Sequence, residues 1–101
     1  MTDLEKVQSD WYALKYIKNP SLEVQFAAVQ RHGYAIEYIK NPAEEVQLTA
    51  VLQNGNAIRC IKNPSMEVQL EAVRQNVHTI KYIENPSEEI QLIAALSQDY
   101  N

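Results

Sequence analysis

The chain has 101 residues, enough for one domain, and its 9 basic and 13 acidic side chains give a net charge of −4. This balance disfavours wholesale nucleic-acid binding and adsorption to anionic membranes, because both usually require a basic surface. No apolar run approaches the roughly 20 residues that span a bilayer, and the polar start "MTDLEKVQSD" is not a secretion signal. The single cysteine, Cys60, excludes an internal disulfide and indicates a reducing cytoplasm, which would be the host's if the protein is viral.

The dominant feature of the sequence is an internal repeat. "YIKNPSLEVQFAAVQRHG" begins at residue 16, and "YIKNPAEEVQLTAVLQNG" begins at residue 38. Four Asn-Pro pairs are spaced by 22 residues without insertions, with prolines at Pro20, Pro42, Pro64 and Pro86. Because equal spacing requires equal geometry, residues 1–101 are predicted to form a single helical-repeat domain.

The first predicted element is the end of an incomplete unit. Asp3-Leu4 aligns with Gln25-Phe26, and "WYALKYIKNP" aligns with "GYAIEYIKNP". Trp11 therefore stands where the next unit has a turn glycine. We expect its side chain to cover the N-terminal end of the array.

Each full unit is predicted to begin with a helix, helix A, at its Asn-Pro pair. The Asn is expected to be the N-cap, with Pro at the first helical position. Glu44 and Glu88, three residues past their Asn, would then complete capping boxes. Apolar residues follow at helical spacing, as in Val24, Ala28 and Val29. The stripe is widened by one further column, Phe26, Leu48, Leu70 and Leu92.

The second predicted helix of each unit, helix B, follows a turn at His32-Gly33 or Asn54-Gly55, where glycine would take the left-handed conformation. Helix B carries Ala35, Ile36, Ile39 and their equivalents, spans about two turns and is too short to be stable alone. Only stacking against neighbours can stabilise it. The predicted fold is therefore all-α: an α-solenoid of short helical hairpins, a HEAT-like superhelical stack of about four 22-residue repeats with half-units at both ends.

The pattern from Glu45-Val46-Gln47-Leu48 to Gly55-Asn56-Ala57-Ile58 resembles short tandem α-helical hairpin repeats of uncharacterised function in bacterial and phage proteins. In those repeats "E-V-x-L-A-A-V-x-x-N-G-x-A-L-x-Y-A" recurs. The resemblance covers nearly the whole chain but not the tight "IKNP" link, which is longer in the commoner form. It carries no catalytic residues. It implies a phage accessory protein, and phage proteins of this size often inhibit host defence enzymes, including CRISPR machinery.

Residues able to support catalysis or metal binding are few. The two histidines, His32 and His78, lie in different units, and no Ser/His/Asp or Cys/His arrangement is visible. Cys60 replaces a tyrosine of its column and is expected to be a small, partly buried thiol rather than a nucleophile. We therefore predict no enzyme activity, no cofactor and no metal site.

Two fixed polar columns have structural explanations. A glutamine column is expected to hydrogen-bond the backbone of a neighbouring unit at the links, and consists of Gln25, Gln47, Gln69 and Gln91. The lysine column Lys18, Lys40 and Lys62, beside tyrosines, would also suit nucleic acid, with phosphates on lysine and bases on tyrosine. Helix-dipole complementarity explains the lysines as well, and Glu84 interrupts the column. Nucleic-acid binding is therefore the alternative function.

The varied columns of helix A are the predicted protein-binding surface, because they are free to be shaped by a partner. The candidate residues are Leu22, Glu44, Leu52, Met66, Glu71, Arg74, Ile93 and Leu96. The predicted function is a non-catalytic protein–protein interaction module, in its sharper form a phage-encoded, anti-CRISPR-like inhibitor whose acidic rows compete for a basic groove. A structural or assembly spacer, in which only the ends matter, is a second alternative.

The last predicted helix, residues 86–97, has no helix B after it. Ile93 and Leu96 lie three residues apart on it and give the end repeat an apolar face. Either Tyr100 folds back as a minimal cap or this end docks against a partner. A homodimer through the C-terminal end is favoured, because two-fold dimers are the commonest oligomers.

Overall fold

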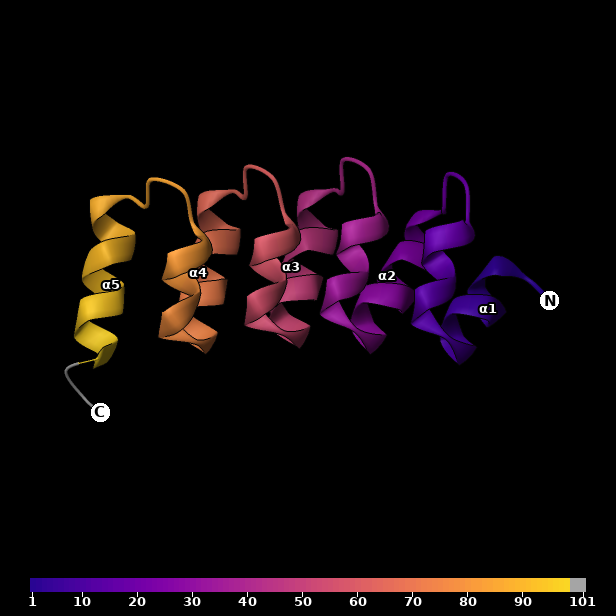
Figure 1. The fold of residues 1–101 in the computed structure, drawn as a ribbon, viewed down its shortest axis with the longest axis horizontal. Helices are drawn as coiled ribbons and strands as arrows, with labels where there is room; N and C mark the ends of the chain where they lie inside the picture. The colour runs from indigo at the N-terminus through magenta and orange to yellow at the C-terminus, as the bar shows by residue number, and fades with distance from the viewer. Residues whose placement is uncertain (99–101) are drawn as a thin grey trace.

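The computed structural model describes residues 1–98 and shows a single row of stacked helix pairs (Figure 1). Each pair is an α-helix followed by a 3₁₀ helix, and the row measures 50 × 24 × 17 Å. The elements are α1 (Asp3–Ser9), η1 (Trp11–Tyr16), α2 (Leu22–Arg31), η2 (Gly33–Tyr38), α3 (Glu44–Gln53), η3 (Gly55–Cys60), α4 (Met66–Gln75), η4 (Val77–Tyr82) and α5 (Glu88–Gln98). The predicted all-α solenoid is confirmed.

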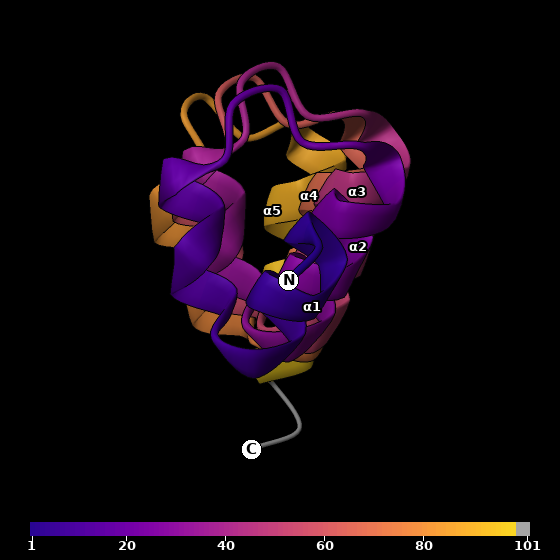
Figure 2. The same cartoon turned by 90° about the vertical axis from the view of Figure 1, so that its right-hand side faces the viewer.

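The pairs form two layers, visible when the stack is viewed from its N-terminal end (Figure 2). The α-helices make one layer, which we call the α layer, and the four 3₁₀ helices make the other, the 3₁₀ layer. Four five-residue links, residues 17–21, 39–43, 61–65 and 83–87, return the chain from the 3₁₀ layer to the next α-helix. All four links run along the same edge of the stack, which we call the link edge (Figures 1 and 2).

Helix B of each unit is a six-residue 3₁₀ helix, longer than the three or four residues usual for this conformation. The residue before each one has an extended backbone, and its side chain accepts a hydrogen bond from the N–H two residues later. Asn54 Oδ1, for example, accepts from the Asn56 N–H at 3.0 Å. Asp10, His32 and Asn76 cap the other three in the same way. Packing supplies the rest, since Ala35 and Ile36 of η2 are fully buried.

The prediction that Asn-Pro pairs cap helix A is wrong. Each Asn has a positive φ of 51° to 53°, namely Asn19, Asn41, Asn63 and Asn85. Asn tolerates this left-handed region better than most residues, so it reverses the chain before the helix. The N-cap is the residue after Pro, as at Ser21, whose Oγ accepts from the Val24 N–H at 3.2 Å.

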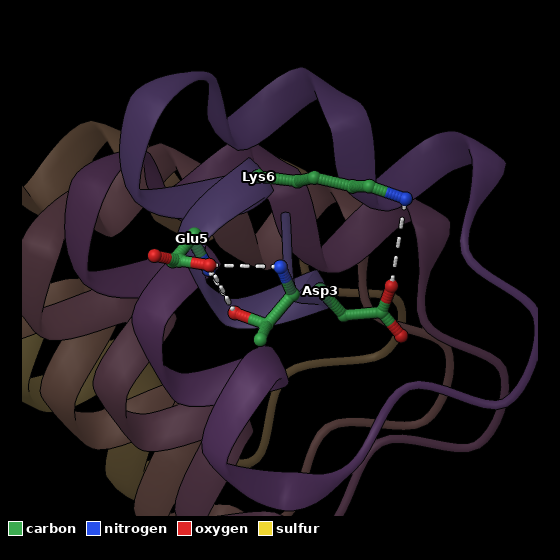
Figure 3. Close-up of polar contacts among 4 residues, drawn as sticks. Asp3, Glu5 and Lys6 are labelled. Atoms are coloured by element: carbon green, nitrogen blue, oxygen red, sulfur yellow. Dashed lines mark hydrogen bonds and ion pairs between the residues drawn. The ribbon is translucent and has the colours of Figure 1, made fainter.

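The predicted capping boxes at Glu44 and Glu88 are also wrong, because both residues are the first of their helices rather than the third. The N-cap of α3 is Ala43, which has no side-chain cap. The chain does contain one capping box, between Thr2 and Glu5 at the start of α1 (Figure 3). There the Thr2 N–H donates to Glu5 Oε1 at 2.9 Å, and the bond from Thr2 lowers the pKa of the Glu5 carboxyl.

The two glycines stand at close contacts with the next α-helix, prohibitive for a side chain only at Gly33, and not in left-handed turns, which corrects the predicted turn. Neither glycine has a positive φ. A Cβ on Gly33 would lie 2.6 Å from the Ala50 carbonyl oxygen of the next α-helix, a distance that side chains do not tolerate. The equivalent Cβ on Gly55 would lie 3.3 Å from the Ala72 oxygen. Glycine therefore lets η2 approach α3.

The core runs unbroken through the stack between the two layers, as the apolar pattern predicts. The α layer contributes Val24, Ala28, Val29 and their equivalents in α3 and α4, together with Ile90 and Ala94 of α5, all at most 5% exposed. The 3₁₀ layer and links contribute Ala35, Ile36, Ile39 and their equivalents Ala57, Ile58, Ile61 and Ile83, while Ile80 of η4 is half-buried against this core. One buried position of this core is polar in the described residues: Thr79 stands where the preceding units have Ala35 and Ala57. Because every core residue packs between units, no repeat is stable without a neighbour.

The two ends of the row differ. At the N-terminal end the short α1 packs against α2, Asp3 and Lys6 form an ion pair at 3.9 Å (Figure 3), and Trp11 stacks on His32 with ring centroids 4.4 Å apart. At the other end α5 is followed by no 3₁₀ helix within residues 1–98. The predicted cap by Tyr100 lies outside the described residues.

Candidate binding surface

Charge is divided between the two layers, which the net charge of −4 conceals. The α-helices carry nine acidic and three basic side chains. The 3₁₀ helices and links carry six basic and two acidic side chains, namely Lys15, Lys18, Lys40, Arg59, Lys62, Lys81, Glu37 and Glu84. An acidic protein therefore has one basic side, and this is the side that holds the link edge.

The aromatic residues follow the same division. All five described tyrosines lie on 3₁₀ helices, as Tyr12, Tyr16, Tyr34, Tyr38 and Tyr82. Most of the rings are already engaged: Tyr12 meets Tyr38 edge-on at 5.5 Å, and the Arg59 guanidinium lies 5.0 Å from the Tyr82 ring centroid. Of the five tyrosine side chains, only Tyr12 (39% of its surface accessible) and Tyr16 (77%) are exposed to solvent. Few ring faces therefore remain free to stack on bases.

Contacts between side chains at the N-terminal end of the 3₁₀ layer shift the pKa values of two tyrosines and a lysine. Lys15 Nζ donates to the Tyr12 hydroxyl at 3.2 Å. Hydrogen bonds with Tyr38 and then Lys15 lower the pKa of Tyr12, and the same contact with Tyr12 raises the pKa of Tyr38. The bond with Tyr12 also raises the pKa of Lys15.

Three crevices lie along the link edge, one between each pair of successive links. Numbered from the N-terminus, they measure about 390, 540 and 560 Å³. Each is lined by the Asn-Pro pair and the glutamine of one unit and by the Ile-Lys pair of the next, with Ile83-Glu84 in the third. Lys40 lines the first and second crevices, and Lys62 lines the second and third. The crevices are therefore equivalent sites that share their lysine walls.

The glutamine column holds the shape of these crevices. Gln25, Gln47 and Gln69 each donate from Nε2 to the proline carbonyl five residues earlier, at 3.0 Å. Gln91 does the same at 2.9 Å. The glutamines thus bond the links, as predicted, but each bonds the link of its own unit and not that of a neighbour. Gln47 Oε1 is buried without a partner among the described residues.

The link-edge lysines are available to a ligand. Lys40 and Lys62 are exposed. Within residues 1–98, no ion pair joins either of them to a carboxylate. The basic side is visible in the sequence when each charge is assigned either to helix A or to helix B and its link. The position of Arg59 beside Tyr82, however, depends on the tertiary packing of η3.

The predicted protein-binding residues all lie in the α layer but do not form one surface. Six are exposed, namely Leu22, Glu44, Leu52, Met66, Arg74 and Leu96, while Glu71 and Ile93 are half-buried. Ile93 is partly buried against the core, and its predicted part in the apolar C-terminal face stays a prediction. Leu22 and Met66 are separated by Glu44 of the intervening helix, and Leu52 and Leu96 by Arg74. The apolar residues are therefore isolated within an acidic layer.

The candidate catalytic side chains are not brought together. His32 stacks on Trp11, and its Nδ1 accepts from the Tyr34 N–H at 3.2 Å. Cys60 Sγ lies 3.9 Å from Glu37 Oε2, and burial together with the charge of Glu37 raises the pKa of the Cys60 thiol. A thiol of raised pKa stays protonated at neutral pH and is a weak nucleophile.

Among the described side chains, no three His, Cys, Asp or Glu residues are grouped to hold a metal ion. In residues 1–98 every helix is too short or too polar to cross a membrane. Comparisons with protein families, with curated proteins and with solved structures find no match for this chain. The evidence on function is therefore the geometry and charge of the stack itself.

Proposed function

We propose that this protein is a non-catalytic protein-binding module and that the partner binds along the link edge. The observation that carries the proposal is the row of three similar crevices walled by Lys40 and Lys62, which are exposed and form no ion pair within residues 1–98. Solenoids bind partners along extended surfaces of this kind, where each repeat adds one contact. A row of equivalent sites suits a ligand that is itself linear.

The α layer supports protein binding less well. Along α2 to α4 its exposed apolar side chains lie among acidic ones, and only α5 carries two exposed leucines close together among the described residues, Leu92 and Leu96. Interfaces usually have an apolar centre from which charges are depleted. The predicted α-layer residues, such as Leu52 and Arg74, remain a prediction that the same experiments test.

Nucleic-acid binding is the second candidate, and the basic, tyrosine-bearing 3₁₀ layer favours it. Two features weigh against it. Tyr38 and Tyr82 are half-buried in contacts with neighbouring side chains, and Glu37 and Glu84 interrupt the row of positive charges. A non-specific strand binder requires a continuous basic groove and free aromatic faces.

The resemblance to phage and bacterial repeats supports a narrower version: an inhibitor of a host defence complex, acting in a reducing cytoplasm. Stability without a disulfide is consistent with that compartment. We also propose that the α5 end forms a homodimer, because Leu92 (59%) and Leu96 (51%) are exposed there. Both statements concern the identity of partners and leave the link-edge proposal unchanged.

The test is affinity capture from a bacterial lysate with tagged protein, with and without nuclease, read by mass spectrometry. One dominant protein complex that survives nuclease supports the proposal. Recovery of nucleic-acid-associated proteins alone, lost on nuclease treatment, supports the second candidate. Recovery of the protein's own copies alone would contradict the proposal and favour the spacer role.

A further inference from the structure

The spacing of the crevices limits what can occupy them together. Five α-helices stand side by side in a row 50 Å long. Each repeat therefore advances the stack by about 10 Å, close to the 8–10 Å at which packed helices lie. A linear ligand that fills all three crevices must place equivalent groups about 10 Å apart.

A peptide in the polyproline II conformation meets this requirement. It rises about 3.1 Å per residue with three residues per turn, so every third side chain projects in the same direction about 9.3 Å further on. A β-strand fails, because its side chains alternate and residues three apart project to opposite faces. Among extended peptide conformations, the repeat spacing therefore selects one whose side chains are recognised at every third residue.

The lining of the crevices defines the chemistry of that residue. Lys40 and Lys62 stand on the two walls between the three crevices, one repeat apart. Carboxylates three residues apart on a polyproline II ligand would reach these two lysines. Isoleucines 39, 61 and 83 line the crevices and are almost buried. They provide an apolar floor for the proline rings or aliphatic side chains between the acidic residues.

The third crevice differs in a way that gives the site a direction. Glu84 stands on its outer wall, where the other crevices have a lysine. A third acidic residue in the series would therefore meet a carboxylate. The favoured ligand therefore has two acidic residues spaced three residues apart. Three residues further along, at the position that lies nearest Glu84, it has a neutral or basic residue.

We infer that the link edge is one linear site for an acidic peptide segment in the polyproline II conformation, read at every third residue by Lys40 and Lys62. The inference rests on the proposed function and names the chemistry of the partner at that same site. It uses no group from outside residues 1–98.

The experiment measures binding of three fluorescein-labelled probes at low ionic strength by fluorescence polarisation, because exposed charge pairs are screened by salt. The first probe is (Glu-Pro-Pro)₄, which repeats glutamate at every third position. The second has the same composition but its glutamates in one block. The third is a single-stranded oligothymidine of twelve nucleotides.

We expect the first probe to bind at least tenfold more tightly than the block peptide. Lys40→Glu with Lys62→Glu should weaken that binding by about tenfold or more, whereas Arg31→Glu with Arg74→Glu, the same charge change in the α layer, should alter it by less than about twofold. Glu84→Lys extends the lysine row and should tighten binding of the first probe by about threefold. This gain cannot arise from loss of folding.

Equal affinity for the two peptides would show that the protein does not recognise a glutamate at every third residue. No peptide binding up to about 1 mM protein would overturn the acidic ligand class. Preference for the oligothymidine would overturn the peptide ligand and support nucleic-acid binding. A captured protein partner that is lost with the α-layer variant but retained with Lys40→Glu and Lys62→Glu would overturn this inference while leaving protein binding intact.

Discussion

The α layer and the 3₁₀ layer come from the same 22-residue unit, yet they depend on stacking to different degrees. The helices α2, α3 and α4 each have ten residues, enough for several backbone hydrogen bonds of their own. Each 3₁₀ helix has six residues and a less favourable hydrogen-bond geometry. The 3₁₀ layer therefore owes more of its conformation to burial of its isoleucines, and each of its helices leads directly into a link of the link edge.

The difference teaches that the surface proposed to bind a partner is positioned by packing between repeats more than by local helix stability. If that is correct, core changes in the 3₁₀ layer should destabilise the protein more than matched changes at an α-helix. Changes on exposed faces of either layer should leave the fold intact.

The largest effect is expected for Ile58→Ala in η3, because Ile58 is 1% exposed and η3 contacts both η2 and η4. A cavity of this size costs about 2–5 kcal/mol of unfolding free energy. The matched control is Ile90→Ala in α5, where Ile90 is fully buried but has a neighbouring unit on one side only. Urea unfolding followed by circular dichroism measures both. A larger loss for Ile90→Ala would contradict the account.

A smaller effect is expected for Gly33→Ala, because the new Cβ would lie 2.6 Å from the Ala50 oxygen and force η2 away from α3. We expect a loss of about 1–3 kcal/mol, as for other overpacking changes. Gly55→Ala, with its nearest contact at 3.3 Å, should cost distinctly less. Thermal unfolding of the two variants compares them directly. Equal melting temperatures would show that the stack relaxes around Gly33 without cost.

At the links, Asn63→Ala should cost about 1–2 kcal/mol, because alanine does not tolerate the left-handed backbone as well as asparagine. Asn63→Gly keeps the φ of 51° without penalty and should be close to neutral. Chemical unfolding of both variants distinguishes a conformational role from a side-chain role. A loss of stability for both would show that the Asn side chain itself is required.

The smallest effect on stability is expected for Leu92→Asp with Leu96→Asp on α5, within about 0.5 kcal/mol, since both side chains are more than half exposed. If α5 forms a homodimer, the same variant should be a monomer in sedimentation velocity while the unmodified protein is a dimer. A monomer in both cases would refute the proposed dimer.

The solenoid, the single domain and the core columns could be predicted from the sequence, because identical spacing and the Val-Ala-Val pattern leave few other ways to bury the apolar side chains. The local geometry could not. Asn-Pro reads equally as an N-cap with Pro at the first helical position or as a left-handed turn before the cap, and only the path of the chain into the next helix selects between them. Gly33 likewise reads as a turn residue until the position of the Ala50 oxygen is known.

The candidate surface was only partly predictable. The lysine and tyrosine columns are visible in the sequence, but the crevices exist only because successive links lie side by side along one edge. The α-layer residues were chosen for their variation from unit to unit, and variation alone does not separate an exposed position from the half-buried column of Glu71 and Ile93. The sequence signal that marks the basic side is the division of charge between helix A and helix B with its link.

The central claim is that the link edge, and not the α layer, binds the partner. Its most direct test is the affinity of the captured partner for two charge-matched variants, Lys40→Glu with Lys62→Glu and Arg31→Glu with Arg74→Glu, measured by titration calorimetry. The account predicts at least a tenfold loss for the link-edge variant and less than about a twofold change for the α-layer variant. The reverse order would contradict it and return the binding surface to the α layer.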